Sequence, residues 1–281
     1  MILFSIFPAV AQEYIPTPID GVLMECGNEV AIGVKWSYCI SRTNRSKSNK
    51  VIYHLHGRNG KATWWNDKSY HTGKIHKAWI DSKISPPVII SISFGKVWLL
   101  LRDESKTGFI EKFINNVIVK METKLKFKPV ERSIMGISMG GLNTLYLSMT
   151  NSEIFKKAVI LCAHIPFISH HDSMFEILNY IYQHDISLKR AYMMYQMSKV
   201  FFPTKRIFEL NNPKVLLDNF IVEKSPAFYI SCGLKDDWGC MKSSNEISKK
   251  IMKKGGIVNW APREGGHCDL DHKLIASFLA K

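Results

Sequence analysis

One serine in this chain stands between two glycines at a spacing that suits a catalytic nucleophile. The stretch Gly136-Ile137-Ser138-Met139-Gly140 follows an apolar run and precedes a helical pattern. On a sharp strand-to-helix turn a serine hydroxyl projects above the sheet edge, and glycines two residues away on either side avoid clashes. The backbone N–H of Met139 then points at an oxygen bound at the start of the helix. We therefore expect Ser138 to be a nucleophile rather than a helix-capping serine.

A serine nucleophile needs a general base, and the base needs a carboxylate to orient it. Both residue types follow later in the chain, each after an apolar, strand-like run. Asp236 and Asp237 lie in "GLKDDWG", and His267 lies in "REGGHCDLDH". The order serine, acid, histidine is one known arrangement of such a triad. We predict Asp236 as the acid and His267 as the base, with Asp237 and His272 as the respective alternatives.

A loop earlier in the chain has the composition of an oxyanion-binding loop. The stretch "HGRNG" ends the apolar run 51–55, where this chemistry needs a second N–H donor. We assign that donor to the backbone of Arg58. We expect nearby residues of suitable type to contact the substrate: His56, Gly57, Trp64, Trp65 and Trp238. His170-His171 have no further ligand at metal spacing, so we predict no metal site.

Short apolar runs alternate with helical patterns along most of the chain. Runs typical of strands buried on both faces of a parallel sheet occupy residues 51–55, 86–93, 132–137, 158–163, 227–232 and 257–262. Helical spacing is clearest in 108–125, 142–150, 242–254 and 270–280. This alternation predicts an α/β fold, with a mostly parallel central sheet and helices on both faces.

Two regions depart from that alternation. Residues 18–40 are rich in strand-forming types around Gly27-Asn28, which predicts an antiparallel N-terminal hairpin at the sheet edge, turning at those two residues. Residues 164–226 form a long apolar insertion with helical periodicity, which we interpret as a helical cap. We expect the cap to lie over the carboxyl ends of the strands and to belong to a single domain spanning residues 12–281.

Composition limits the classes of partner. The chain has 281 residues, 46% of them hydrophobic, and a formal net charge of +14. No arginine cluster or nucleic-acid-reading motif accompanies this charge, so we interpret it as a lysine-rich surface and expect no nucleic-acid partner. No run approaches the roughly 20 apolar residues of a membrane span, so we expect no stable membrane insertion. A small-molecule ester or acyl substrate is the expected partner.

The N-terminal stretch and the cysteines bear on the compartment. "MILFSIFPAVAQEY" reaches Ala9-Val10-Ala11 after a short apolar run, as at a secretory cleavage site, although a basic start is missing. We interpret residues 1–11 as a residual signal peptide and expect a secreted or periplasmic protein, with a cytoplasmic one as the alternative. None of the six cysteines forms a CxxC pair, and export would permit disulfides. Cys162 and Cys232 are interpreted as inert core thiols, whereas a Cys240–Cys268 disulfide or close contact is predicted beside the expected triad.

The motifs HGRNG, GISMGG, GLKDDWG and GGH, in this order and at these spacings, resemble the esterase D-like branch of the α/β-hydrolases. That branch includes feruloyl and acetyl esterases, S-formylglutathione hydrolases and mycobacterial mycolyltransferases. The resemblance covers about residues 20–280. It implies an α/β-hydrolase fold, hydrolysis of carboxylic esters or thioesters, no cofactor, and Asp236 as the acid. An acyltransferase or serine peptidase on the same fold, or an inactive binding protein, is the alternative.

Overall fold

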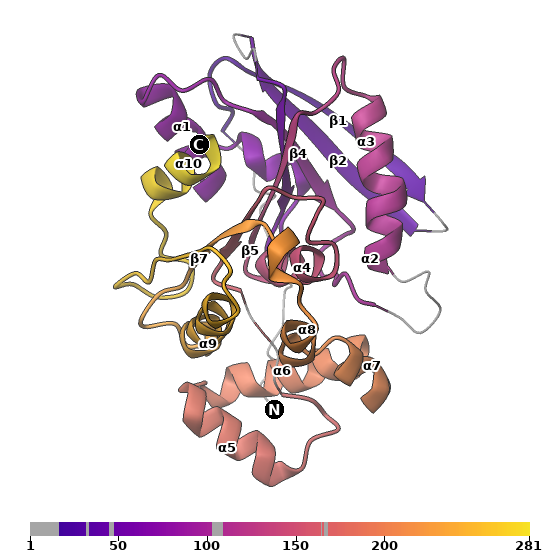
Figure 1. Cartoon of the computed structure of the whole chain (residues 1–281), viewed down its shortest axis with the longest axis vertical. Helices are drawn as coiled ribbons and strands as arrows, with labels where there is room; N and C mark the ends of the chain where they lie inside the picture. Colours follow the sequence, from indigo (N-terminus) through magenta and orange to yellow (C-terminus); the bar gives the residue numbers. More distant parts are fainter. Residues whose placement is uncertain (1–16, 32–33, 45–47, 103–108, 164, 166–167) are drawn as a thin grey trace, which may run out of the picture.

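Eight strands form one sheet in the computed structural model of the protein (Figure 1). The structure describes residues 17–31, 34–44, 48–102, 109–163, 165 and 168–281, so the interpreted signal peptide lies outside it. The strand order is β1-β2-β4-β3-β5-β6-β7-β8. The pairs β1–β2 and β2–β4 are antiparallel, and all the other pairs are parallel. The predicted mostly parallel sheet with an antiparallel hairpin at its edge is thereby confirmed.

The strands are β1 (Val22–Ala31), β2 (Val34–Thr43), β3 (Lys50–Leu55), β4 (Val88–Ser93), β5 (Glu131–Ile137), β6 (Lys157–Leu161), β7 (Ala227–Ser231) and β8 (Val258–Trp260). Each apolar run interpreted as a parallel strand is one, to within two residues at either end. The reason is burial on both faces: every residue of β4 is buried, which leaves no room for the polar alternation of a half-exposed strand.

The α-helices are α1 (His71–Asp81), α2 (Phe109–Lys112), α3 (Val119–Thr123), α4 (Met139–Thr150), α5 (Met174–His184), α6 (Leu188–Phe201), α7 (Lys205–Leu210), α8 (Pro213–Asp218), α9 (Cys240–Lys253) and α10 (His272–Ala280). A π-helical segment, Phe113–Ile118, joins α2 to α3, and 3-10 turns span Ala62–Asn66 and Val222–Lys224. In the described part of the chain, no helix has the length and apolar character needed to cross a membrane.

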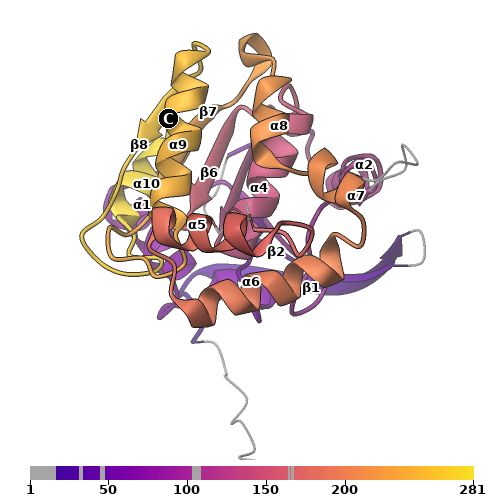
Figure 2. The same ribbon diagram turned by 90° about the horizontal axis from the view of Figure 1, so that it is seen from below.

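Helices cover both faces of the sheet (Figures 1 and 2), and an apolar cluster on each face holds them against it. On one face Trp79 of α1 packs with Ile275 of α10, and the Trp79 indole N–H donates to the carbonyl of Ala276 over 2.8 Å. On the other face Leu145 of α4 and Ile247 of α9 belong to the larger cluster. Helices on both faces are therefore what keeps the strands buried on both sides.

The edge hairpin differs from the expectation in its turn. β1 continues through Gly27 and Asn28, so the turn predicted there is wrong. Gly27 pairs with Tyr38 of β2, and a Cβ at Gly27 would come within 2.6 Å of the Tyr38 hydroxyl oxygen. The glycine thus makes room for a cross-strand tyrosine. β1 ends at Ala31, which pairs with Val34 at the start of β2, and a Cys26–Cys39 disulfide joins the two strands.

Between β6 and β7 the chain leaves the sheet and forms α5, α6, α7 and α8 (Figure 2). Ser173 begins α5 with a capping box, because its hydroxyl accepts from the N–H of Glu176 while the Glu176 carboxylate accepts from the N–H of Ser173. α5 contacts α9, and α8 packs between α4 and α9. The insertion is therefore attached to the helices that flank the nucleophile turn and the acid loop.

Two buried histidines make the stability of this fold depend on pH. His54 in β3 and His76 in α1 are 0% and 1% exposed. Burial, helped by the neighbouring His56, lowers the pKa of His54 to about 3, and burial lowers the pKa of His76 to about 4. Both rings stay neutral in the folded protein at pH values where an unfolded histidine, with a pKa near 6.5, binds a proton. The folded state therefore loses stability as the pH falls from about 6.5 towards 4.

We predict that His76→Phe reduces this dependence. Neither ring nitrogen of His76 has a hydrogen-bond partner in the described structure, so phenylalanine keeps the shape and loses only the proton-binding group. When the pH is lowered from about 7.5 to about 5.5, the free energy of unfolding of the variant should fall by about 1.4 kcal/mol less than that of the parent protein. Urea unfolding at the two pH values measures this difference. An equal loss of stability in both proteins would contradict the prediction.

Candidate active site

Ser138 is the one residue between the end of β5 and the start of α4. Its backbone has φ 54° and ψ −116°, a region that costs a residue other than glycine about 1–3 kcal/mol. A Cβ at Gly136 would overlap the carbonyl oxygen of Gly140, and a Cβ at Gly140 would overlap that of Leu55 in β3. The Ser138 N–H donates to the carbonyl of Leu161 at the end of β6, over 2.8 Å. These contacts leave the hydroxyl projecting at the carboxyl edge of the sheet.

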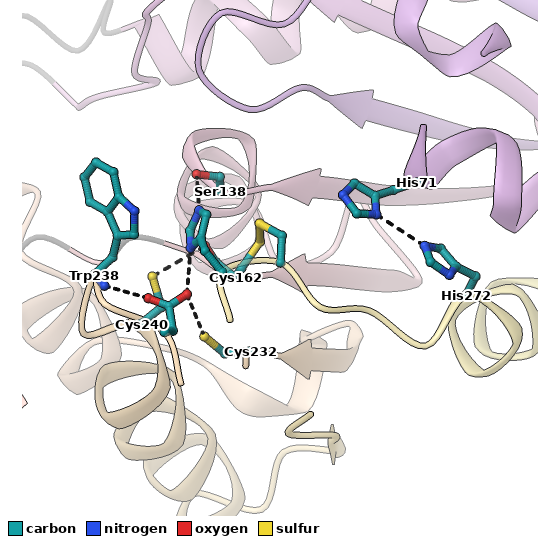
Figure 3. Close-up of a disulfide and its surroundings, with 10 residues drawn as sticks. His71, Ser138, Cys162, Cys232, Trp238, Cys240 and His272 are labelled. Carbon is teal, nitrogen blue, oxygen red and sulfur yellow. Dashed lines mark hydrogen bonds and ion pairs between the residues drawn. A yellow bond between two sulfur atoms is a disulfide. The ribbon is translucent and has the colours of Figure 1, made fainter. Parts of the chain in front are cut away.

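His267 lies between Ser138 and Asp236 (Figure 3). Its Nε2 is 3.1 Å from Ser138 Oγ, and its Nδ1 is 2.6 Å from Asp236 Oδ2. An ionised carboxylate accepts from Nδ1–H, which leaves Nε2 free to accept from the serine hydroxyl. The geometry therefore provides a base aimed at the serine and held in the required tautomer.

Backbone contacts between two loops bring the acid and the histidine together. The N–H of Leu234 donates to the carbonyl of Arg263 over 2.6 Å, and the N–H of Lys235 donates to that of Gly265 over 3.0 Å. A Cβ at Gly233 would overlap the carbonyl oxygens of Gly265 and Gly266. The loops that follow β7 and β8 are thus packed backbone to backbone, and their side chains meet above them.

The Asp236 carboxylate is sealed from solvent and well supplied with donors. Its side chain is 0% exposed. The backbone N–H of Trp238 donates to Oδ1 over 2.8 Å, and the Cys232 thiol donates to Oδ2 over 3.6 Å (Figure 3). Burial by itself raises the pKa of Asp236, but the hydrogen bond and charge of His267, together with the other donors, outweigh it and hold the pKa below its usual value. The carboxylate therefore stays ionised.

The two alternatives face elsewhere. Asp237 has a side chain that is 51% exposed, and it pairs with Arg190 Nε at 3.1 Å. His272 begins α10, where its Nε2 is 3.3 Å from His71 Nδ1 (Figure 3). The structure thus brings Asp236 and His267 together with Ser138, and it gives Asp237 and His272 other partners.

The loop after β3 lies against the nucleophile turn. The N–H of Asn59 donates to the carbonyl of Lys96 over 2.8 Å, and that of Gly60 donates to the carbonyl of Gly57 over 3.0 Å. Within the described ranges, the N–H of Arg58 has no backbone acceptor. Met139 is the first residue of α4, where the N–H groups have no partner inside the helix. Both expected donors are therefore available at the pocket wall.

Two of the three reactive side chains open on a pocket of about 340 Å³. Ser138 and His267 line it, as do Gly57, Arg58, Met139 and Trp238. Apolar walls come from Leu99, Ile137, Leu142 and Met197, and the cap helix α6 contributes Met197 together with Arg190. An ester with an apolar portion would be partly enclosed there.

Three residues expected to contact substrate do not line the pocket. His56 is buried under its own loop, where Nδ1–H donates to the carbonyl of Gly57 and Nε2 accepts from the Ser93 hydroxyl, both over 2.7 Å. Trp65 is fully buried and stacks on Trp79 at 6.1 Å between ring centroids. Trp64 packs against Tyr70, and it is Tyr70 that reaches the pocket. For His56 and Trp65 the prediction is wrong, because both side chains fill the core.

The predicted Cys240–Cys268 disulfide is also wrong. Cys268 forms a disulfide with Cys162, which follows β6, so Cys162 is not a core thiol (Figure 3). Cys240 begins α9 with its side chain turned inward, and its thiol donates to the carbonyl of Cys162 over 3.6 Å. Cys232 and Cys240 are free and buried. Cys268 is therefore bonded to the residue that follows β6 and not to the first residue of α9.

Two groups of side chains in the described ranges come within metal-ligand distance of one another. In the first, Cys162 and Cys268 are joined to each other and offer no thiolate beside His267. In the second, Cys232, Asp236 and Cys240 are buried, and burial raises the pKa of the Cys240 thiol well above its usual value. The Cys232 thiol donates to the Asp236 carboxylate and the Cys240 thiol donates to the carbonyl of Cys162, so hydrogen bonds account for this group.

Sequence reasoning missed Asn143, which ties a neighbouring loop to the nucleophile helix. Its Oδ1 accepts from the N–H of Leu100 over 2.7 Å, and its Nδ2 donates to the carbonyl of Trp98 over 3.2 Å. The Trp98 N–H in turn approaches Met139 Sδ at 3.3 Å. The available signal was a single amide in the otherwise apolar stretch "LNTLYL". Such a buried amide needs partners, and here they are backbone groups of the pocket wall.

Comparisons with known proteins agree with this geometry. A family model described as "Putative esterase" matches residues 37–177. None of the curated proteins compared matches the chain. Similar solved structures include a ferulic acid esterase, with a TM-score of 0.63 and 15% identity over 92% of this chain and 94% of that one. Another is the S-formylglutathione hydrolase FrmB from Staphylococcus aureus, with a TM-score of 0.57 and 17% identity over 92% and 96%. These similarities show the α/β-hydrolase fold.

The Cys162–Cys268 disulfide holds the residue after His267 to the end of β6. We therefore predict that removing this disulfide lowers turnover. In Cys162→Ser/Cys268→Ser the imidazole should lose its fixed position, and kcat/KM for phenyl acetate should fall roughly ten- to a hundredfold. The matched control is Cys26→Ser/Cys39→Ser, which removes the disulfide of the edge hairpin and leaves the pocket wall untouched. Equal activity of the two double variants, both folded by circular dichroism, would contradict the prediction.

Proposed function

We propose that this chain, which belongs to the esterase family of α/β-hydrolases, hydrolyses carboxylic esters through a covalent acyl-enzyme on Ser138. The observation that carries the proposal is the position of His267, whose two ring nitrogens lie 3.1 Å from Ser138 Oγ and 2.6 Å from Asp236 Oδ2. The family supports ester hydrolysis as the reaction. The mechanism is inferred from the side-chain geometry.

In the first half of the reaction Ser138 Oγ attacks the ester carbonyl carbon. His267 Nε2 accepts the hydroxyl proton, and the resulting imidazolium lies against the buried Asp236 carboxylate. The low pKa of Asp236 keeps that charge in place, so the imidazolium is stabilised by an ion pair rather than by proton transfer to the acid. His267 then gives its proton to the departing alcohol.

The backbone N–H groups of Met139 and Arg58 bind the oxyanion of the tetrahedral intermediate. Both residues line the pocket beside Ser138, and each has an N–H available. The N–H of Met139 also lies at the positive end of α4, which favours negative charge there. Donors held in place before the reaction stabilise the developing charge without rearrangement.

In the second half a water molecule replaces the alcohol. His267, again neutral, takes a proton from that water, and the hydroxide formed attacks the acyl carbon on Ser138. Collapse of the second tetrahedral intermediate breaks the bond between the acyl carbon and Ser138 Oγ, and His267 returns its proton to that oxygen as the carboxylic acid leaves. Every proton in these steps therefore moves between Ser138, His267, the ester and water.

We also propose that the protein works outside the cytoplasm. Two disulfides, Cys26–Cys39 and Cys162–Cys268, support an oxidising compartment. Cell fractionation, with thiol alkylation before lysis, tests this. Protein confined to the cytoplasm with all cysteines alkylated would overturn it.

We predict that Ser138→Ala lowers kcat for phenyl acetate by about 10⁴-fold or more, because the acyl-enzyme can no longer form. A fluorophosphonate should label the parent protein at Ser138, identified by mass spectrometry of the peptide, and should not label the variant. Ser148→Ala, which removes a buried hydroxyl from the same helix, is the matched control and should keep its turnover and labelling. Full turnover by Ser138→Ala would overturn the proposed mechanism.

The neighbouring aspartates give a second prediction. Asp236→Asn should lower kcat by about 10³-fold or more, because an amide neither fixes the Nδ1–H tautomer of His267 nor stabilises the imidazolium. Asp237→Asn changes the same group one residue away and should cost less than about tenfold, since Asp237 lies outside the hydrogen bonds to His267. Steady-state kinetics on phenyl acetate decide between them. A larger loss in Asp237→Asn would mean that the acid is misassigned.

A further inference from the structure

The pocket beside Ser138 carries two guanidinium groups. Arg58 comes from the loop after β3, and Arg190 comes from the cap helix α6. Among the described residues that line this pocket there is no aspartate and no glutamate. An ester that is neutral throughout would leave the Arg58 guanidinium without a carboxylate partner and Arg190 with Asp237 alone, which lies outside the pocket lining.

We propose that the esters this enzyme hydrolyses best carry an anionic group, a carboxylate or a phosphate, which Arg58 and Arg190 bind beside Trp238. The inference rests on the proposed function, since it concerns the substrate of the same serine. It names the chemical class of the ester, which the family does not.

Both guanidinium groups are placed by one indole. Arg190 Cζ lies 4.2 Å from the centroid of the Trp238 ring, and Arg58 Cζ lies 5.8 Å from it. Cations at these distances from an indole are attracted to its π face. Trp238 is itself fixed to the reaction centre, because its backbone N–H donates to Asp236 Oδ1 and its ring lies 5.8 Å from that of His267. The positive charges therefore stand at the mouth of the pocket, next to the catalytic residues.

Hydrogen-bond donors remain for a ligand. Arg190 uses Nε to bind Asp237 Oδ2 at 3.1 Å, on the solvent side of the loop, which leaves its two terminal NH₂ groups. In the described structure Arg58 is exposed and pairs with no carboxylate. A guanidinium binds a carboxylate or phosphate through two parallel N–H···O bonds, so this pair can hold one oxyanion from two sides.

The rest of the pocket adds no competing charge. His71 also lines it, but burial, with the nearby His272 and Lys74, lowers the pKa of His71 to about 4, so its ring is neutral at pH 7. The other walls are mostly apolar. The formal net charge of +14 also favours the approach of an anionic ester over long distances.

Two matched pairs of esters test the proposal. On the alcohol side these are 4-acetoxybenzoate and its methyl ester, and on the acyl side monophenyl glutarate and phenyl pentanoate. The measured quantity is the ratio of kcat/KM for the anionic ester to kcat/KM for its neutral partner. Because the two esters of a pair differ in intrinsic reactivity, this ratio is compared between protein variants and not between esters. The two pairs also show on which side of the scissile bond the anion is held.

In Arg58→Gln/Arg190→Gln the ratio should fall about tenfold or more for at least one pair, the size expected when charge-assisted hydrogen bonds are lost. The ratio is the readout because the backbone of Arg58 also belongs to the proposed oxyanion site, and any general loss divides out. Arg190→Lys should keep part of the preference. Lys205→Gln removes a cap charge that does not line the pocket, and it should leave the ratio unchanged.

A ratio in the double variant within about twofold of the parent value, for both pairs, would overturn the inference. So would an equal fall in Lys205→Gln, which would assign the preference to overall charge. These outcomes are separate from a failure of the proposed function. If Ser138 is labelled by fluorophosphonate and neutral esters are turned over, only the inference on substrate class has failed; if Ser138→Ala keeps its turnover, the proposed function has failed as well.

Discussion

The passage from β5 into α4 within one residue is the constraint on which the rest of the site depends. It is possible because Gly136 and Gly140 let β5, α4 and β3 approach at distances that no side chain would allow. Ser138 takes the left-handed backbone conformation that this turn imposes, and its cost of about 1–3 kcal/mol is offset by α4, whose residues from Met139 to Met149 are all buried. The hydroxyl position is thus set by packing of the backbone and not by hydrogen bonds of its own.

Once that hydroxyl stands at the carboxyl edge of a parallel sheet, the other loops have little freedom in where they end. β3, β7 and β8 all run parallel to β5 or to its neighbours, so the loops that follow them emerge at the same edge. For this reason the meeting of Asp236, His267 and the HGRNG loop beside Ser138 could be predicted from the sequence without knowing any distance. The strands could be predicted for a related reason: a strand that is buried on both faces has a continuous run of apolar residues.

The errors share a different physical cause, which is that side-chain direction depends on tertiary packing. Position in the chain puts Cys240 near Asp236 and Cys268 near His267, but Cys268 is bonded to Cys162, and the free Cys240 thiol donates to the Cys162 carbonyl. Trp65 follows the oxyanion loop closely, yet it points into the core beneath α1. Which residues of α6 reach the pocket could not be foreseen either, because the insertion has no sheet partner whose register would place them. Composition indicates helices there and says nothing of which residue faces Ser138.

The dipeptide Asp236-Asp237 shows how one loop serves two purposes through environment alone. Asp236 is sealed, accepts from His267 and Trp238, and remains charged because those donors outweigh the cost of burial. Asp237 faces solvent and anchors Arg190, whose guanidinium also lies on the ring of Trp238. The same few residues therefore orient the base on one side and position a cation of the pocket on the other. A change in the loop after β7 would alter the reaction centre and the charge that meets the substrate together, so we expect the two properties to be coupled in this enzyme.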